Sequence, residues 1–589
     1  MSIGMISDIT EDMLLQAANF LEGFQTHDEK AHLRGAENLC FIARAVGPQR
    51  TRNEFLPFIQ NFFSDGDEVL GVFSEELGKF VDLVGGSSFA YTLIRPLELL
   101  ASKEDAFVRE SACNSLITVL EAMPPADVAS QGFDLVKRFC TSDWFTMRVS
   151  ASCLFPAVYP HCLENQKEEL LQMYSRLVED PVQIVRNFAA QSLKNLIPHV
   201  EKVHLKGRIA EMMGRLSQDT HDAIRLWMMG AVVAAAKQLT SEETCAVILP
   251  IARCLAKDNS WRVRYKAAEL IDGLCASPSV NEVRQEIIPI YLELLGDSEP
   301  VVKTEASARL ASVCERLPAE VIVKQILPPI KEIAKDDGCT FKETLVVGVM
   351  AVSSLLTKSE FNREVLPLLL DFLSDRESIE VRQTVLANLS SITKVLDLNQ
   401  ISARLVPAIE SLTSDDIPWR VRVSVMSSIP LVATEMHEAA FKEKLLPMCL
   451  DWVCDGVVAV RKAGMACLCE VGKVFGPEWV GKNLMPFCCT LCRGNTHKER
   501  QTGLACLGTF AAVCSEEYLF TQALPAVSGL SRDVVPNVRL NAADTLGILI
   551  RIMTRTAWKK EAIATLERMA SSDSDADVKY RAAQALKDT

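Results

Sequence analysis

An Asp followed six residues later by Arg or Lys recurs about every 39 residues along this chain of 589 residues. Self-similarity at a fixed period of this length is the signature of a repeat architecture, in which each unit packs mainly on its two neighbours. The sequence therefore predicts a solenoid rather than several globular domains. The pairs are Asp180/Arg186, Asp219/Arg225, Asp258/Arg264, Asp297/Lys303, Asp336/Lys342, Asp416/Arg422, Asp455/Arg461, Asp533/Arg539 and Asp573/Lys579.

The basic position can be followed from Arg109 to Lys579 in steps of 38 to 40 residues, and Arg34 and Leu70 extend it toward the N-terminus. A series of prolines, from Pro250 to Pro525, keeps the same step independently. Two markers in phase exclude an accident of composition. We therefore expect an all-α solenoid (an α-α superhelix) of about fifteen repeats that forms one domain over residues 1–589.

Each repeat has the pattern of two helices. Residues 285–295 and 301–317 both carry apolar side chains at helical spacing, and Gly296 and Asp297 separate them. Pro289 lies early in the first helix, where it costs few hydrogen bonds and can bend the axis. The polar turn residues offer side-chain oxygens to the free N–H groups that begin the second helix.

The Asp–base series is explained most simply as hydrogen bonds between stacked turns. We expect the Asp of one repeat to lie near the base of the next, with each exposed pair contributing only about 0.2–1 kcal/mol and mainly setting register. Two repeats depart from the pattern. Gly494 occupies the Asp position before Arg500, and one extra residue separates Asp375 from Arg382. These two turns are candidate weak points of the stack.

Charge excludes several kinds of partner. Lys and Arg number 62 against 76 Asp and Glu, a net charge of −14, which disfavours nucleic acid or an anionic membrane as the main partner. The N-terminus lacks the pattern of a signal peptide, and no apolar run is long enough for membrane insertion. The 19 cysteines lie on apolar helical faces and are expected to be small buried hydrophobic residues.

Catalytic and metal-binding motifs are missing from the sequence. There is no P-loop, GxSxG, HExxH or kinase signature, and none of the eight histidines pairs with carboxylates at ligand spacing. The pair Cys489 and Cys492, near His497, lacks a second pair of ligands. Gly494–His497 is interpreted as a polar turn. We therefore expect no enzyme, no cofactor and no metal.

Three turns between the helices of a repeat carry a tryptophan: Trp144, Trp261 and Trp419. A large ring at a turn needs a reason, because turns are normally polar. One interpretation is an anchor for a partner, since Trp and Arg dominate interface hot spots. The other is that the indole packs on the turn of the next repeat. The sequence leaves both open.

These turns resemble those of the scaffold (A) subunits of the type 2A serine/threonine protein phosphatase, a family built of fifteen HEAT repeats. The resemblance covers essentially the whole chain and is weakest over residues 1–45. It rests on Arg50–Thr51–Arg52, Asp67–Glu68–Val69–Leu70, Leu83–Val84–Gly85–Gly86, Asp143–Trp144–Phe145–Thr146, Ser260–Tyr265 and Trp419–Arg422.

The resemblance implies a non-catalytic scaffold, cytoplasmic and with the nucleus left open, that joins the phosphatase catalytic subunit to an exchangeable B-type regulatory subunit. Residues 400–589 (repeats 11–15) would present the catalytic-subunit ridge, with Trp419, Arg420, Val457, Val458, Val535, Asn537 and Arg539. Residues 1–300 (repeats 1 to 7 or 8) would present the regulatory-subunit ridge, with Asp65, Glu68, Glu104, Asp105, Trp144, Phe145, Arg186, Trp261 and Arg262.

One position departs from the family pattern, because Asn187 follows Arg186 where the family would have a second Arg. An amide cannot make the two-pronged, charge-assisted contact of a guanidinium, so we expect at least one regulatory class to bind more weakly or through different contacts. An importin-like or coat-like transport adaptor, also HEAT-built and acidic, is the alternative. It would leave the turn tryptophans unexplained.

Overall fold

The computed structural model describes residues 11–26, 28–275, 281–335, 341–374, 378–393, 401–413 and 417–587. Over these ranges every regular element is a helix, which confirms the predicted all-α class. Asp336, Asp375 and Asp416 of the repeat series lie outside the described residues. The chain divides into two units, residues 1–309 and 310–589, each of which is described by itself.

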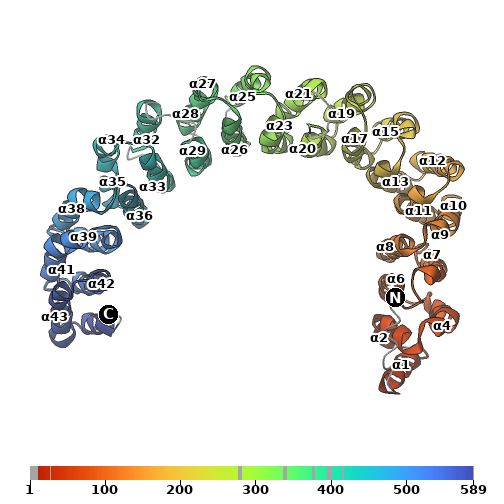
Figure 1. Cartoon of the computed structure of the whole chain (residues 1–589), viewed down its shortest axis with the longest axis horizontal. Coiled ribbons are helices and arrows are strands. Elements are labelled where there is room, and N and C mark those ends of the chain that lie inside the picture. The colour runs from red at the N-terminus through yellow and green to blue at the C-terminus, as the bar shows by residue number, and fades with distance from the viewer. Residues whose placement is uncertain are drawn as a thin grey trace. The chain divides into compact units, whose positions relative to one another are not determined.

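In the first unit each repeat pairs a first helix with a second helix (Figure 1). The first helices are α1 (Glu11–Gly23), α5 (Leu56–Ile59), α7 (Ile94–Leu100), α10 (Phe133–Cys140), α12 (Glu164–Val178), α15 (Ala210–Leu216), α19 (Leu249–Ala256) and α21 (Asn281–Leu295). The second helices are α2 (Glu29–Glu37) with α3 (Leu39–Val46), α6 (Asp67–Leu77), α8 (Ala106–Ala122), α11 (Phe145–Val158), α13 (Gln183–Leu196), α16 (Asp222–Arg225) with α17 (Met228–Ala236), α20 (Trp261–Cys275) and α22 (Pro300–Ala308).

The second unit repeats the arrangement. Its first helices are α25 (Leu327–Ile333), α28 (Leu366–Ser374), α32 (Val406–Glu410), α34 (Glu438–Lys444) with α35 (Leu446–Val453), α37 (Pro477–Asn483) with α38 (Met485–Cys492), α41 (Leu524–Leu530) and α43 (Thr556–Ser572). Its second helices are α23 (Leu310–Cys314), α26 (Lys342–Val352), α29 (Ile379–Ala387) with α30 (Ser390–Thr393), α33 (Trp419–Thr434), α36 (Val458–Phe475), α39 (His497–Phe510), α42 (Pro536–Ile552) and α44 (Ala576–Lys587).

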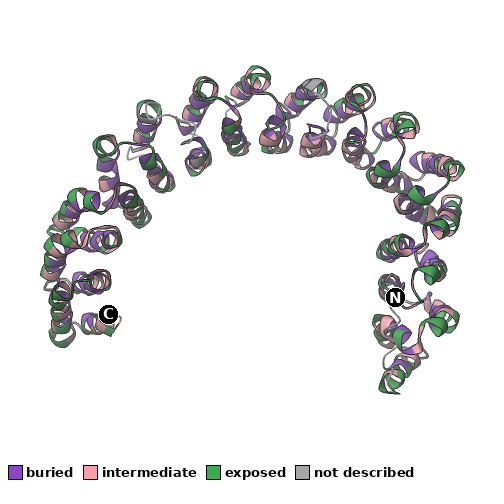
Figure 2. Cartoon of the chain, viewed as in Figure 1, coloured by how far each residue is buried: buried purple, intermediate pink, exposed green. Residues whose placement is uncertain are grey.

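The core of each unit lies between its two layers of helices. Helix α11 packs on α10 of its own repeat and on α8 and α13 of the neighbouring repeats. The apolar residue before most of the bases, such as Val185, Val263 and Val538, is fully buried or nearly so. Figure 2 shows the buried residues where helices face one another and the exposed residues on their outer sides. This is the nearest-neighbour burial expected of a repeat protein.

Several of the periodic prolines follow a local widening of the helix. Pro250 lies in the first turn of α19, directly after the π-helical turn Thr244–Ile248. The same π-turn precedes Pro328, Pro367 and Pro525. Proline has no N–H to donate and crowds the preceding turn, and a π-turn accommodates both effects. Pro289, for which the bend was predicted, differs from these prolines, because it lies well inside α21 and not early in the helix as predicted.

One helix boundary differs from the prediction. The pattern indicated a single helix over 301–317, but α22 ends at Ala308 and α23 begins at Leu310. The N–H of Arg309 is shared between the carbonyls of Glu305 and Ala306, at 3.3 and 3.2 Å, which tightens the turn there. Apolar periodicity continues through such a break, so the sequence pattern does not reveal it.

Candidate partner-binding surface

The turn between the two helices of a repeat is shaped by its Asp. Oδ1 of Asp219 accepts the backbone N–H of His221, two residues on, at 3.0 Å. Asp180, Asp258 and Asp533 do the same for Val182, Ser260 and Val535 at 2.8–2.9 Å. This is an Asx-turn, in which the side chain imitates a backbone turn. The side-chain oxygens were predicted to bind the free N–H groups that begin the second helix. They bind instead the N–H of the residue just before that helix.

In seven repeats the base pairs with the Asp of the following repeat. Nε of Arg186 lies 2.7 Å from Oδ2 of Asp219, and its Nη2 lies 3.3 Å from Oδ1. We call these inter-repeat pairs the Asp–Arg ladder. The pairs, with closest N–O distances of 2.6–3.1 Å, are Arg148–Asp180, Arg186–Asp219, Arg225–Asp258, Arg264–Asp297, Arg422–Asp455, Arg500–Asp533 and Arg539–Asp573.

Two features of the predicted ladder were wrong. The pairing direction is reversed: the base of one repeat pairs with the Asp of the next repeat, whereas the Asp of one repeat was predicted to lie near the base of the next. The cause is a bond within the repeat, in which Nη1 of Arg186 donates to the carbonyl oxygen of Asp180 at 2.9 Å. That bond points the rest of the guanidinium at the next repeat. The pairs are also shielded from solvent, since the carboxylate side chains are only 6–11% exposed. The figure for a fully exposed ion pair therefore understates their contribution.

Burial and pairing act in opposite directions on the ladder carboxylates. Burial alone would raise the pKa of Asp219, but the hydrogen bonds from Arg186 and the N–H of His221 outweigh it, and the pKa is lowered. The pKa of Arg186 is raised, chiefly by its hydrogen bond to Asp219. Both shifts favour the charged pair. The turns are thereby held in register at neutral pH.

The ladder is interrupted at two described arginines. Nη1 of Arg461 donates to the carbonyl oxygens of Asp455 and Gly456, at 2.8 and 3.1 Å, but the facing position in the next repeat is Gly494. Arg109 likewise donates to two carbonyls of its own turn and faces Ser142. The predicted interruption at Gly494 thus leaves the preceding repeat's arginine, and not Arg500, without a ladder carboxylate.

Large apolar side chains are exposed on these turns. Trp144 is 65% exposed, Trp261 46% and Trp419 40%. The guanidinium of Arg420 lies 4.8 Å from the centre of the Trp419 ring. None of the three rings is buried against the turn of a neighbouring repeat, as the packing interpretation would require. Exposed Trp beside Arg is the composition of interface hot spots.

Sequence reasoning missed further exposed apolar side chains on the same turns. They lie two to five positions before the base of their repeat, and they are Phe107, Ile184, Val301 and Val534. A sequence signal could have identified them: each of these turns carries a second apolar residue, besides the buried residue that directly precedes the base. Together with the tryptophans they make the intra-repeat turns unusually apolar for exposed positions.

The predicted regulatory-ridge residues differ in whether their side chains are exposed or are held in bonds within the protein. Glu68, Glu104, Trp144, Phe145, Trp261 and Arg262 are exposed. Asp105 caps α8 by accepting the N–H of Val108, and Arg186 belongs to the ladder. Asp65 accepts from Nδ1 of His32 at 2.7 Å. Asp65, Asp105 and Arg186 therefore have structural bonds on these turns, while the exposed members present their side chains to solvent.

The predicted catalytic-ridge residues divide in the same way. Trp419, Arg420, Val458 and Asn537 are exposed, and Val457 and Val535 are half-buried. Arg539 is 8% exposed, and its guanidinium holds both carboxylate oxygens of Asp573 at 2.8 and 2.7 Å. Arg539 thus fixes its turn, and the exposed residues of the set are those able to contact another molecule.

Asn187 has a role between repeats. Its Oδ1 accepts the indole Nε1–H of Trp227, in the next repeat, at 3.1 Å. An arginine has no acceptor, so it could not make this bond. The Asn that replaces the second Arg of the family pattern therefore serves as the hydrogen-bond acceptor for Trp227.

The described residues contain no cluster of three or more His, Cys, Asp or Glu side chains able to hold a metal ion. Burial raises the pKa of the Cys492 thiol to about 12, and that of Cys489 is also raised. Both shifts oppose the thiolate form that binds metals. Within the described parts of the chain, no helix combines the length and apolar character needed to cross a bilayer.

Comparison with solved structures and family models defines the class of fold. A family model for HEAT repeats matches residues 497–587. The structure of Kap95p with RanGDP aligns with a TM-score of 0.53 at 14% identity, covering 97% of this chain and 74% of that one. Kap95p with Nup1 aligns at 0.52, also with 14% identity, over 98% and 73%. At such identity the likeness concerns the fold alone. The chain is an all-α HEAT-repeat protein.

Sequence comparison goes further. The beta isoform of the human 65 kDa regulatory A subunit of serine/threonine-protein phosphatase 2A is 34% identical over 383 residues, 64% of each chain. The regulatory A subunit of Schizosaccharomyces pombe protein phosphatase PP2A is 37% identical over 41% of this chain and 42% of its own length. The Arabidopsis thaliana alpha isoform is 38% identical over 35% and 34%. This chain is a homologue of these regulatory A subunits, with alignments that span less than two thirds of each relative.

Proposed function

We propose that this protein is a non-catalytic scaffold of protein phosphatase 2A. It joins the catalytic subunit, bound on residues 400–589, to an exchangeable B-type regulatory subunit, bound on residues 1–300, and it acts in the cytoplasm. The proposal rests on similarity to regulatory A subunits. The observation that carries it is the series of exposed Trp, Phe and Val side chains on the intra-repeat turns.

The mechanism is one of proximity. Two proteins held on one frame have a raised effective concentration for each other, without any new chemistry. A substrate brought by the regulatory subunit is presented to the phosphatase site. The ladder supports this by fixing each turn, so that Trp144 or Trp419 is presented on a preorganised backbone and little ordering cost remains at binding.

The test uses matched variants of the full chain and purified partners. Trp419→Ala with Arg420→Ala should weaken, by at least about tenfold, the binding of a phosphatase 2A catalytic subunit, because hot-spot truncations cost about 2 kcal/mol or more. The affinity for the regulatory subunit should stay unchanged in this variant. Trp144→Ala with Trp261→Ala should do the reverse. Calorimetry or surface plasmon resonance measures both.

Control variants are available at equal exposure away from these turns. Leu163 is 67% exposed, like Trp144, and Val474 is 41% exposed, like Trp419. Leu163→Ala and Val474→Ala should leave both affinities unchanged. Equal loss of both partners in the Trp variants, together with lost helicity in circular dichroism, would instead make the rings structural. Binding of a Ran-type GTPase without any phosphatase would favour the transport adaptor.

A further inference from the structure

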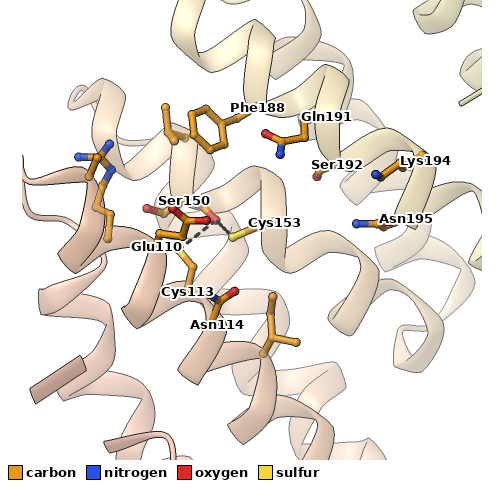
Figure 3. Close-up of a pocket in the computed structure, with 14 residues that line it drawn as sticks. Glu110, Cys113, Asn114, Ser150, Cys153, Phe188, Gln191, Ser192, Lys194 and Asn195 are labelled. Carbon is orange, nitrogen blue, oxygen red and sulfur yellow. Dashed lines mark hydrogen bonds between the residues drawn. The ribbon is translucent and has the colours of Figure 1, made fainter. Parts of the chain in front are cut away.

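A cavity of about 300 Å³ opens between α8, α11 and α13 in the first unit (Figure 3). Its lining mixes apolar side chains with polar ones, among them Arg109, Glu110, Gln191 and Lys194. The proposed scaffold function makes no use of it. The feature that separates this cavity from an ordinary gap between helices is a pair of cysteines.

Cys113 of α8 and Cys153 of α11 both line the cavity and come from neighbouring repeats. Sγ of Cys153 lies 3.0 Å from the carbonyl oxygen of Ser150, and Sγ of Cys113 lies 4.0 Å from the same oxygen. The two thiols also influence each other's pKa values. Figure 3 shows the two side chains meeting at this carbonyl. Two thiols are thus adjacent and reachable from an open cavity.

The surroundings make the two thiols unequal. The hydrogen bond from Cys153 lowers the pKa of Cys113 against the opposing effect of burial, and Ser150 and the charge of Arg109 lower it further. The pKa of Cys153 is raised, first by its bond to Cys113 and then by burial. The thiolate is the reactive form of cysteine, so Cys113 is the better nucleophile and Cys153 the natural second thiol.

We propose that Cys113 and Cys153 form a reversible oxidation site, at which a hydroperoxide links α8 to α11 by a disulfide. The Cys113 thiolate attacks one peroxide oxygen, so that an S–O bond forms and the O–O bond breaks. The departing hydroxide takes a proton and leaves as water. The product is a sulfenic acid on Cys113.

Cys153 completes the reaction. Its sulfur attacks the sulfur of the sulfenic acid, so that the S–S bond forms and the S–O bond breaks. The hydroxide leaves with the proton of Cys153 as a second water. In sum, two thiols and one hydrogen peroxide give one disulfide and two waters, and a dithiol reductant reverses the change. This chemistry is independent of the proposed phosphatase partners.

The experiment is peptide mapping of the purified full chain after graded hydrogen peroxide and alkylation of the remaining thiols. We expect a cross-linked peptide containing Cys113 and Cys153, lighter by two hydrogens, which dithiothreitol abolishes. Cys153→Ser should stop the reaction at Cys113 sulfenic acid, trapped by dimedone. Cys113→Ser should leave Cys153 reduced. Circular dichroism verifies that both variants fold.

The same sample contains a control pair. Cys449 and Cys467 also hydrogen-bond each other but are 0% and 3% exposed, and the pKa of Cys467 is raised. They should react more slowly than Cys113, because the raised pKa of Cys467 disfavours the reactive thiolate and the pair lies almost wholly out of solvent. Oxidation of Cys113 no faster than that of Cys449, or disulfides of Cys113 only with cysteines other than Cys153, would overturn the proposal. This comparison uses the unmodified protein and does not depend on how the variants fold.

Discussion

The contribution of one ladder carboxylate can be measured by comparing two arginines that differ in little else. Arg186 and Arg461 each donate Nη1 to the carbonyl oxygen of the Asp at the start of their own turn, at 2.9 and 2.8 Å. Arg186 also binds Asp219 through two nitrogens, whereas the position facing Arg461 is Gly494. Replacing each arginine by Met removes the same bonds to carbonyls, but only Arg186→Met leaves a shielded carboxylate behind.

The magnitude lies between two limits. Exposed pairs contribute about 0–1 kcal/mol, and breaking a buried pair costs about 3–5 kcal/mol. The Arg186 and Asp219 side chains are 16% and 9% exposed, and Asp219 keeps its bond from the N–H of His221 in the variant. We therefore expect Arg186→Met to cost about 2 kcal/mol of local opening free energy, and Arg461→Met about 1 kcal/mol or less.

Hydrogen–deuterium exchange with mass spectrometry is the appropriate assay, because a repeat protein opens locally and need not unfold in one step. A cost of about 2 kcal/mol predicts roughly 30-fold faster exchange in α13 and α15 of Arg186→Met. Arg461→Met should accelerate exchange in α36 and α38 by roughly fivefold at most. Equal acceleration in the two variants would refute the reasoning, because the carboxylate would then add nothing to the carbonyl bonds.

Two further predictions concern other contacts. Both nitrogens of His32 face acceptors, Asp65 and the carbonyl of Thr26, and these bonds outweigh burial and raise its pKa above 6.5. Stability from this group is therefore complete below pH 6.5 and is lost as the pH rises through the raised value. His32→Gln should abolish that loss of protection in α2, and its persistence would contradict this account. A side-chain Cβ at Gly503 would lie 2.8 Å from the backbone N of Cys492, so Gly503→Ala should cost about 2 kcal/mol in thermal unfolding. The control Gly529→Ala, with open space around it, should cost nothing; equal shifts in the melting temperature would refute the steric argument.

The fold could be predicted because the same residue types recur at a fixed period in the sequence. The buried apolar residue before most bases and the proline of many first helices recur in phase, and helical spacing of apolar residues locates the helices between these markers. Details that depend on three-dimensional direction could not be predicted. The Asp–Arg spacing is the same whether a base pairs with the Asp of the next repeat or of the previous one. The direction is fixed only by the bond from Arg186 to the carbonyl of Asp180, which the spacing does not reveal.

The sequence placed the candidate residues on the intra-repeat turns, but it did not show which of them the structure leaves exposed. The sequence around Trp144 and Trp419 was equally compatible with a ring packed on the next turn and with an exposed ring. Their exposure depends on how neighbouring turns are placed, which the sequence of one repeat does not show. Arg186 and Arg539 carry charge like Arg262 and Arg420, yet the first two are held in the ladder and the last two are exposed. Sequence shows the residue type, whereas the bonding partner decides what remains available.

The interruption at Gly494 has a consequence for mechanics. When a stacked protein is stretched, the load passes through every junction in series, and the junction with the fewest cross-links yields first. Between α36 and α39 the tension is carried by helix packing and by the Cys469 thiol, which lies 3.7 Å from the carbonyl oxygen of Thr509, without a ladder pair. Among the junctions of residues 417–587, an optical trap should record the earliest rip there, and the freed segment would extend while the neighbouring repeats stay intact.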